Sequence, residues 1–455
     1  MITTPPAPSA PRPMHFPKPV ETTLPNGLRV VAVTQRNLPL VAAHLIVRCG
    51  ATSDPRDRPG LATLTATLLT QGAGALSATE IAERVDALGA RLDAAAGYDA
   101  STLSVMAMTT KFRPALELAA DVVRNPSFTA DDLERVKGKA LSDLKLTYGS
   151  PSSLARLVAT RLAFGDGLYA HPVAGTPASV AGFSRNDLVA FHRTHYAPSR
   201  SLLVIGGDID AADALRLASD VFGAWHDPSE VAPEVGDTGS PPKARFVVVD
   251  QPAAGRTAIA TAHPAVRRRA DDYYAGIVAT AILSGYSGRL NQEVRVKRGL
   301  SYGAGAQLIA RRNAGVFSAA TLVDHRKAPE ATEVIQATLR GLLDSPPQPA
   351  ELGTRKTNVL GNFARSVETV EGLISTFGEY ALYDLALDEI ERFQEAIESV
   401  AAAAVVEFAR RYVAVETSVA LVGAADEFID QLATSGREIE RVPFDALDLG
   451  RAALR

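Results

Sequence analysis

Two kinds of hydrophobic pattern follow one another along the chain, and the same succession occurs twice. Short apolar runs predict β-strands at 28–33, 41–48, 201–206, 245–250, 257–263 and 418–423. Apolar residues spaced three and four positions apart predict helices at 78–88, 115–123, 131–146, 186–196, 329–343 and 401–412. Because each half opens with strands and continues with long helices, we expect an α+β fold in which helices cover mainly antiparallel sheets.

A segment without apolar periodicity divides the chain near its middle. Residues 228–243 are rich in proline, glycine and acidic residues, which is typical of a linker. Three residues before it recur 217 positions later (408 − 191, 418 − 201 and 423 − 206): Phe191 and Phe408, Ser201 and Ser418, Gly206 and Gly423. A constant offset across a helix and a strand predicts a duplication, with homologous domains at 20–227 and 244–455.

Composition excludes several classes of function. The 455 residues are 46% hydrophobic and 22% charged, which is ordinary for a globular protein. A net charge of −4 gives no reason to expect nucleic acid or an anionic membrane surface as a partner. Cys49 is the only cysteine, so an intrachain disulfide and a multi-cysteine metal site are both excluded.

The first residues are expected to form a flexible arm. Residues 1–19 are rich in proline and lack the apolar run of a signal peptide or a membrane span. We therefore expect no membrane association and a cytoplasmic location, with the periplasm as the alternative if a signal was removed.

The helix expected after Gly60 is short of groups that could bind a metal. Its sequence, GLATLTATLL, places Thr63, Ala66 and Thr67 within about one turn of each other. It resembles the zinc-binding helix of the pitrilysin and mitochondrial processing peptidase family, the inverzincin-type metallopeptidases, which have His, Glu and His at these positions. A threonine hydroxyl is a poor zinc ligand, and alanine cannot accept a proton. The isolated chain is therefore expected to bind no zinc cofactor and to be inactive.

The family's third zinc ligand is a glutamate on a later helix. Asp143 lies 76 residues after Thr67 (143 − 67), on a predicted helix that resembles the family's. One carboxylate without imidazole partners does not make a zinc site, because catalytic zinc takes about three protein ligands. For Asp143 we expect an ordinary surface or capping role.

Further segments extend the resemblance over nearly the whole chain. They are 24–29 (LPNGLR), His171-Pro172 with Gly175-Thr176, 187–192 (DLVAFH), 196–198 (YAP) and 203–208 (LVIGGD). The resemblance implies two similar α+β domains that form one half of a clam-shell chamber.

The second half has a segment that the family uses in catalysis. Residues 287–302, SGRLNQEVRVKRGLSY, resemble the family segment that supplies an arginine and, seven residues later, a tyrosine; here these are Arg295 and Tyr302. In the family the pair reaches from the C-terminal half of the molecule to the zinc half, where it contacts the substrate carbonyl. A guanidinium and a phenol are suitable donors to the oxyanion of peptide hydrolysis.

Two residues near this pair are less specific indicators of function. Gly299 suits a turn between the arginine's helix and the tyrosine's strand, a connection that brings the two side chains near one another. Arg298 is expected either to pair with an acidic residue or to help bind substrate, and the sequence does not decide between these roles.

The loss of the zinc set and the retention of Arg295 and Tyr302 lead to one main hypothesis. The chain resembles the non-zinc subunit of a bacterial heterodimeric metallopeptidase, which implies a homologous His-x-x-Glu-His partner that holds the zinc. Peptides are the expected substrates. The alternatives are a structural subunit like the core proteins of the respiratory bc1 complex, which has no need of the pair, and a free-standing peptide-binding protein.

Overall fold

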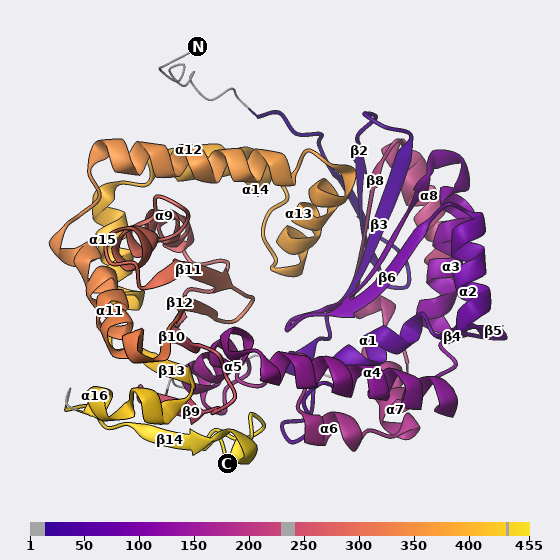
Figure 1. The fold of residues 1–455 in the computed structure, drawn as a ribbon. Helices are drawn as coiled ribbons and strands as arrows, with labels where there is room; N and C mark the ends of the chain where they lie inside the picture. The colour runs from indigo at the N-terminus through magenta and orange to yellow at the C-terminus, as the bar shows by residue number, and fades with distance from the viewer. Residues whose placement is uncertain (1–13, 229–241, 434–435) are drawn as a thin grey trace, which may run out of the picture.

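The computed structural model describes residues 14–228, 242–433 and 436–455, which form two six-stranded sheets with helices around them (Figure 1). The first sheet has the order β1-β2-β8-β3-β7-β6 and the second the order β14-β9-β13-β10-β12-β11. The first sheet consists of β1 (Val20–Thr23), β2 (Arg29–Thr34), β3 (Leu40–Val47), β6 (Arg91–Ala96), β7 (Ser101–Met108) and β8 (Ser201–Gly207). The second consists of β9 (Phe246–Asp250), β10 (Thr257–Ala265), β11 (Ser301–Ala310), β12 (Gly315–Val323), β13 (Ser418–Gly423) and β14 (Glu440–Pro443).

The helices of each half follow its strands. The first half has α1 (Leu61–Leu69), α2 (Ala78–Ala87), α3 (Phe112–Arg124), α4 (Ala130–Gly149), α5 (Pro151–Phe164), α6 (Pro177–Ala181), α7 (Arg185–His195) and α8 (Ala211–Phe222), with a small β4 (Gly72–Ala73) and β5 (Leu76–Ser77) pair. The second has α9 (Tyr273–Leu283), α10 (Arg289–Asn291), the π-helical turn η4 (Gln292–Val296), α11 (Ala328–Asp344), α12 (Pro349–Ser366), α13 (Val370–Leu382), α14 (Glu389–Ser399), α15 (Ala402–Tyr412) and α16 (Ile429–Ala433). The predicted α+β class and mainly antiparallel sheets are confirmed. No helix of the described residues is both long enough and apolar enough to span a bilayer.

The two sheets repeat one arrangement, but with a register that differs from the sequence-based one. Ala42 and Val204 face the same side of the first sheet, and Ala258 and Ala420 face the corresponding side of the second. Both pairs are related by 216 residues (258 − 42 and 420 − 204), not by the 217 expected from Ser201 and Ser418. A shift of one residue turns every strand side chain to the opposite face, so 216 is the shift that superposes the two cores.

Each sheet is covered on one face by a helix from the other half of the chain. Helix α5 packs its Leu154 and Val158 against β10 and β13 of the second sheet. Helix α13 packs its Ile374 and Phe377 against β3 and β8 of the first. The exchange is visible in Figure 1, where purple α5 lies on the salmon strands and orange α13 on the indigo ones. Neither half therefore buries its sheet without the other, although the ranges 20–227 and 244–455 each supply the strands of one sheet.

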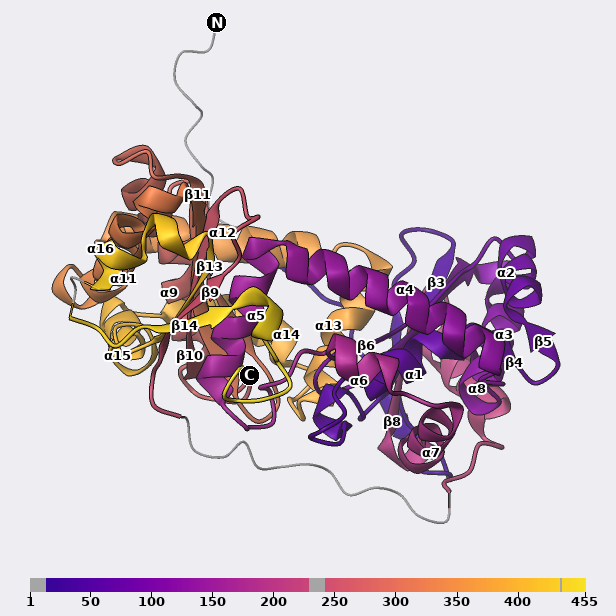
Figure 2. The ribbon, with the colours of Figure 1, turned by 60° about the horizontal axis from the view of Figure 1, so that its bottom comes forward.

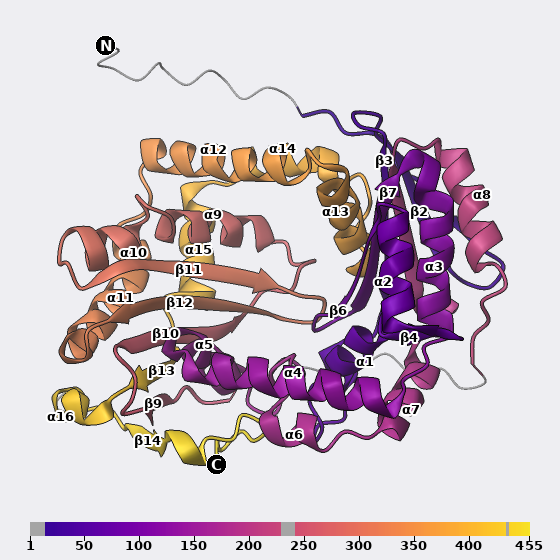
Figure 3. The same ribbon diagram turned by 45° about the vertical axis from the view of Figure 1, so that its right-hand side comes forward.

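The halves also meet through the tips of two hairpins. Helix α4 runs from one half to the other in Figure 2, and the β11–β12 hairpin reaches toward β6 in Figure 3. The Arg311 guanidinium carbon lies 4.1 Å from the ring centroid of Tyr98. Asp99 accepts hydrogen bonds from the Tyr169 hydroxyl (2.7 Å) and from the backbone N–H of Arg312 (3.2 Å). We call these residues the hairpin contact.

The predicted arm and linker lie largely outside the described residues. This applies to residues 1–13 of the arm and to 229–241 of the linker. Residues 14–19 are described, and here the Phe16 ring lies 6.1 Å from that of Phe363 on α12. The end of the expected arm is therefore packed on the second half.

Candidate functional site

Helix α1 begins at a buried acidic cap. Gly60 precedes the helix with φ 99°, a conformation that favours glycine. The Asp54 carboxylate accepts hydrogen bonds from the backbone N–H groups of Gly60 (2.6 Å) and Ala62 (2.7 Å). Apolar residues such as Leu64 and Leu68 then fix the helix against the first core. The scaffold of the expected zinc helix is thus intact.

The positions of the missing ligands are occupied by groups bonded within the protein. The Thr63 hydroxyl donates to the carbonyl of Val173 at 2.6 Å, and the Thr67 hydroxyl donates to the carbonyl of Thr63 at 2.8 Å. Ala66 is 1% exposed and offers only a methyl group. Hydroxyls engaged in this way, together with a methyl group, do not fit a zinc ion, which prefers imidazole, thiolate and carboxylate ligands.

Asp143 does not complete a metal site either. Its carboxylate lies 2.7 Å from the Lys139 ammonium, one turn earlier on the exposed face of α4. Within residues 14–228, 242–433 and 436–455, no group of three or more His, Cys, Asp and Glu side chains could hold a metal ion. The surface role expected for Asp143 agrees with this ion pair.

The connection between η4 and β11 holds Arg295 at the surface. Val294 and Leu300 are buried and anchor its two ends in the second core. Gly299 has φ +60°, and its N–H donates to the carbonyl of Arg295 at 3.0 Å, which closes the turn expected at this glycine. With Val294 and Leu300 turned inward, Arg295 is exposed.

Tyr302 points outward because β11 contains a bulge. Ser301 pairs with Val323 on β12, but the next pair joins Ala304 to Thr321, so Tyr302 and Gly303 together face a single residue. The Thr321 hydroxyl donates to the carbonyl of Gly303 at 2.8 Å and fixes this irregularity. Tyr302 is consequently 77% exposed. The sequence analysis did not predict this bulge, because the bulge depends on pairing with a strand further along the chain.

Each member of the pair contacts a different neighbour. The Arg295 guanidinium carbon lies 5.4 Å from the ring centroid of Tyr286, which is itself 75% exposed. The Arg256 guanidinium carbon lies 4.9 Å from the ring centroid of Tyr302. Cations over aromatic faces restrict both partners. Tyr286 and Arg256 are residues that sequence reasoning missed; Arg256 is 46 positions from Tyr302 (302 − 256), so only the folded sheet brings them together.

Arg298 is held by an acidic neighbour. Its guanidinium forms an ion pair with the Glu293 carboxylate and donates to the Glu293 carbonyl at 3.0 Å. Hydrogen bonds from Lys297 and Arg298 lower the pKa of Glu293. The geometry favours the structural role for Arg298, and a substrate contact stays a prediction.

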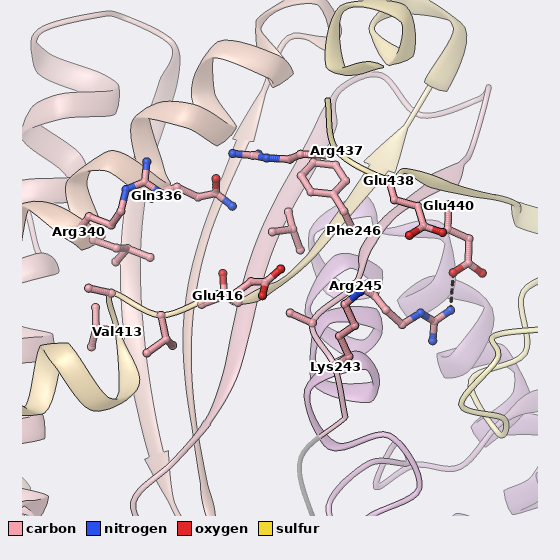
Figure 4. Close-up of a pocket in the computed structure, with 16 residues that line it drawn as sticks. Lys243, Arg245, Phe246, Gln336, Arg340, Val413, Glu416, Arg437, Glu438 and Glu440 are labelled. Carbon is pink, nitrogen blue, oxygen red and sulfur yellow. Dashed lines mark hydrogen bonds and ion pairs between the residues drawn. The ribbon is translucent and has the colours of Figure 1, made fainter. Parts of the chain in front are cut away.

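A large pocket lies elsewhere in the second half. Its lining includes the α11 residues Gln336 and Arg340, Phe246 at the start of β9, and Glu416 before β13 (Figure 4). No residue of the 286–305 segment lines it. Four basic and three acidic side chains surround the space: Lys243, Arg245, Arg340, Arg437, Glu416, Glu438 and Glu440. This mixture of signs selects neither an anion nor a cation.

Two family models match the chain. The model described as Insulinase (Peptidase family M16) matches residues 29–168, and the model described as Peptidase M16 inactive domain matches residues 182–359. An uncharacterized zinc protease of Mycobacterium tuberculosis is 27% identical over 407 residues, covering 87% of this chain and 92% of that protein. One of Bacillus subtilis is 21% identical, covering 81% and 90%.

Solved structures show the same fold. A crystal structure titled as a peptidase M16 inactive domain from Pseudomonas fluorescens has a TM-score of 0.84 and 26% identity, covering 89% of this chain and 98% of that one. A protease from Helicobacter pylori has a TM-score of 0.82 at 19% identity, covering 90% and 100%, which is a likeness of fold. The chain therefore belongs to peptidase family M16, the pitrilysin family, as its sequence motifs indicated.

Proposed function

We propose that this chain is the non-zinc subunit of a heterodimeric M16 metallopeptidase that cleaves peptides. The observation that carries the proposal is the contrast between two sites. At the zinc-helix positions, the hydroxyls of Thr63 and Thr67 donate hydrogen bonds to backbone carbonyls. Arg295 and Tyr302 are exposed, and neither side chain forms an ion pair or a hydrogen bond with a described residue.

The roles of the two exposed groups follow from their chemistry. When water adds to a peptide carbonyl, negative charge develops on the oxygen, and donors fixed in advance stabilise that charge. The Tyr302 hydroxyl donates one hydrogen bond, and the Arg295 guanidinium adds further donors and a positive charge. The zinc and the general base would come from a homologous partner with His-x-x-Glu-His, because Thr63, Ala66 and Thr67 do not fit the metal and the described residues contain no other group that could hold it.

The alternatives make different use of the same surface. A structural subunit gains nothing from an exposed tyrosine and arginine, since neither stabilises the fold when left in water. A peptide-binding protein without peptidase activity would use the surface to bind peptide but would never show cleavage with any partner. We prefer the peptidase subunit because both groups are suited to an oxyanion.

Reconstitution tests the proposal. The chain is mixed with a homologous subunit that carries His-x-x-Glu-His, and cleavage of fluorogenic peptides is followed. We expect cleavage only in the mixture, and a loss of about 100- to 1,000-fold in kcat for Tyr302→Phe and for Arg295→Ala, with KM changed much less. Arg193→Ala, at an exposed α7 arginine that forms no ion pair with a described residue, is the matched control. Full activity in both variants would refute the assigned roles.

A further inference from the structure

A pocket of about 290 Å³ lies beside β11, on the face of the second sheet that α5 partly covers. Its floor is formed by small residues of the strands, including Ala258, Gly303 and Gly305, and its wall by Ser152 and Arg156 of α5. Gly303 follows Tyr302 directly. A group bound against Gly303 therefore lies one residue along β11 from the proposed oxyanion donor, although Tyr302 does not itself line the pocket.

The internal repeat places a second pocket at the same position in the first sheet. In the second sheet Ala258 pairs with Leu322, and Gly305 pairs with Ala320. In the first sheet the corresponding ladder pairs Ala42 with Met106, and Asp93 with Ser104. The 216-residue shift relates Met106 to Leu322 and Ser104 to Ala320 (322 − 106 and 320 − 104), so the position of Gly305 is that of Asp93.

The pocket of the first sheet is closed by charged side chains. Its volume is about 10 Å³, and it is lined by His44, Arg91, Asp93 and Glu371 among others. The Arg91 guanidinium pairs with Asp93 at 2.5 Å and lies 4.0 Å from Glu371 at the start of α13. The corresponding space is thus much smaller in the first half than in the second.

In the pocket of the second sheet, the backbone conformation does not require glycine at either glycine position. Neither Gly303 nor Gly305 has a positive φ. A Cβ at Gly303 would meet nothing nearer than Asn291 at 3.7 Å, and a Cβ at Gly305 nothing nearer than Ser284 at 3.7 Å, both ordinary contacts. A methyl group would fit at both positions, so glycine is not required there, and the absence of side chains leaves the pocket open.

The charge around the open pocket is positive. Arg156 is exposed on α5 and forms no ion pair with a described residue. Arg256, two residues before the pocket residue Ala258, lies over the Tyr302 ring, and the nearest acidic group paired with it is Asp324 at 4.0 Å. A ligand that fills this space beside Arg156 is therefore expected to carry a negative charge.

We propose that this pocket is a subsite for a carboxylate of the peptide substrate, with Arg156 as the ion-pair partner of that carboxylate. The carboxylate is either an acidic side chain or the free C-terminus of the peptide. The inference rests on the proposed peptidase function, because it takes peptides as the ligands that reach Tyr302. It adds that peptides with a carboxylate close to the bond at Tyr302 are the preferred ones.

Direct binding tests the subsite without a partner. Dye-labelled peptides that differ only in one Glu or Gln, or only in a free or amidated C-terminus, are titrated into the full chain and followed by fluorescence anisotropy. We expect removal of the relevant carboxylate to weaken binding about fivefold, and the pair of peptides that shows the loss identifies its source. Arg156→Gln should abolish the preference, and Arg156→Glu should shift it toward a peptide with Lys at the same position.

Two further variants distinguish binding in the pocket from general electrostatic attraction. Gly305→Leu fills the pocket and should remove the preference while Arg156 remains. Arg193→Gln removes a distant exposed arginine and should leave the preference unchanged. The subsite is refuted if wild-type protein binds no peptide, binds Glu and Gln peptides equally, or keeps its preference in Arg156→Gln.

Failure of the proposed subsite can be distinguished from failure of the proposed peptidase function. A reconstituted complex that cleaves acidic and neutral peptides equally refutes the subsite and leaves the peptidase role intact. A carboxylate preference in binding, without cleavage in any mixture, supports the subsite and refutes the peptidase role.

Discussion

The first half of the chain carries helix α1, where the family's zinc ligands would stand, and the second half carries the connection from η4 to β11. The two halves contain sheets with equivalent strand orders, yet the polar groups of the two regions are used differently. Thr63 and Thr67 are bonded inside the first half, whereas Arg295 and Tyr302 extend from the second. The comparison teaches that one framework can lose a metal site without losing its helix, because Asp54 and the apolar face hold α1 in place.

The edge strands β6 and β11 of the two sheets also differ in the side chains that they carry. At β6 the side chains of Arg91 and Asp93 close the space under α13. At β11 two glycines leave it open under α5. Under the proposed function, the second half supplies the oxyanion donors, while the first half contributes packing and the α5 wall with Arg156. Four experiments test how far this division holds.

The largest effect is expected from restoring the ligands of the first half. Thr63→His, Thr67→His and Asp143→Glu together supply two imidazoles and a carboxylate, the three protein ligands of a catalytic zinc. We expect the triple variant to retain one zinc per chain after dialysis, and wild-type protein to retain none. At about 1,000 times its Kd, zinc would stabilise the variant by about 4 kcal/mol, measurable as a rise in Tm.

The matched control for this experiment keeps Asp143 unchanged. The double variant with two histidines alone has only an incomplete ligand set and should bind zinc much more weakly. If the triple variant also binds no zinc, then α1 and α4 do not bring the three positions together, and the first half has lost more than its ligands.

The exchange of helices should make the two halves unfold together. Phe377 on α13 is fully buried against the first sheet, and Phe377→Ala removes most of a large aromatic side chain from that core. We expect a loss of about 3 to 5 kcal/mol in the free energy of unfolding, measured by urea denaturation. Leu154→Ala on α5 is the counterpart against the second sheet and should cost about 2 to 5 kcal/mol.

The two variants also test the coupling itself. Because each sheet depends on a helix of the other half, circular dichroism and tryptophan fluorescence should report one common transition in both. Separate transitions, with each variant lowering only one of them, would mean that the halves fold independently in spite of the exchange.

Four buried or half-buried histidines in the first half, against one in the second, should make acid weaken the first half more, although burial raises the pKa of Asp54 to about 7 and this acts in the opposite direction. Burial lowers the pKa of His44, His171, His192 and His195 in the first half, and of His263 in the second. For His195 burial is the main cause and the nearby Arg200 adds to it, and the pKa falls from 6.5 to about 4. Since the folded state disfavours the protonated form, stability is full above pH 6.5 and is lost as the pH falls toward 4.

Hydrogen exchange at pH 5 and at pH 7, corrected for the intrinsic effect of pH, would measure this difference. We expect protection to fall more in β3 and β8 than in β10 and β13. His195→Gln should reduce the loss in the first half. An equal fall in both sheets, unchanged by this substitution, would exclude the buried histidines as the cause.

How far the sequence predicted these features depends on how local each feature is. The bounds of strands such as β13, and the missing ligands at Thr63 and Thr67, follow from neighbouring residues alone. Tyr302 turns outward because β11 pairs with β12. Its neighbour Arg256 is the residue just before β10, which the fold brings to the Tyr302 ring. The exchange of α5 and α13 could not be predicted, because an amphipathic pattern shows that a helix has a buried face but not which sheet receives it.

The smallest expected effect concerns the hairpin contact, where the two halves meet. Arg311 is 8% exposed and lies over both Tyr98 (4.1 Å) and Tyr169 (5.0 Å), so Arg311→Met keeps most of the apolar volume and removes two cation–π contacts. We expect a loss of about 1 to 2 kcal/mol in the free energy of unfolding, since the rings and the guanidinium are desolvated. Arg326→Met, at an exposed arginine on the far side of β12, should change the stability by less than about 0.5 kcal/mol. An equal effect of the two substitutions would mean that the hairpin tips only touch, and that α5 and α13 alone join the halves.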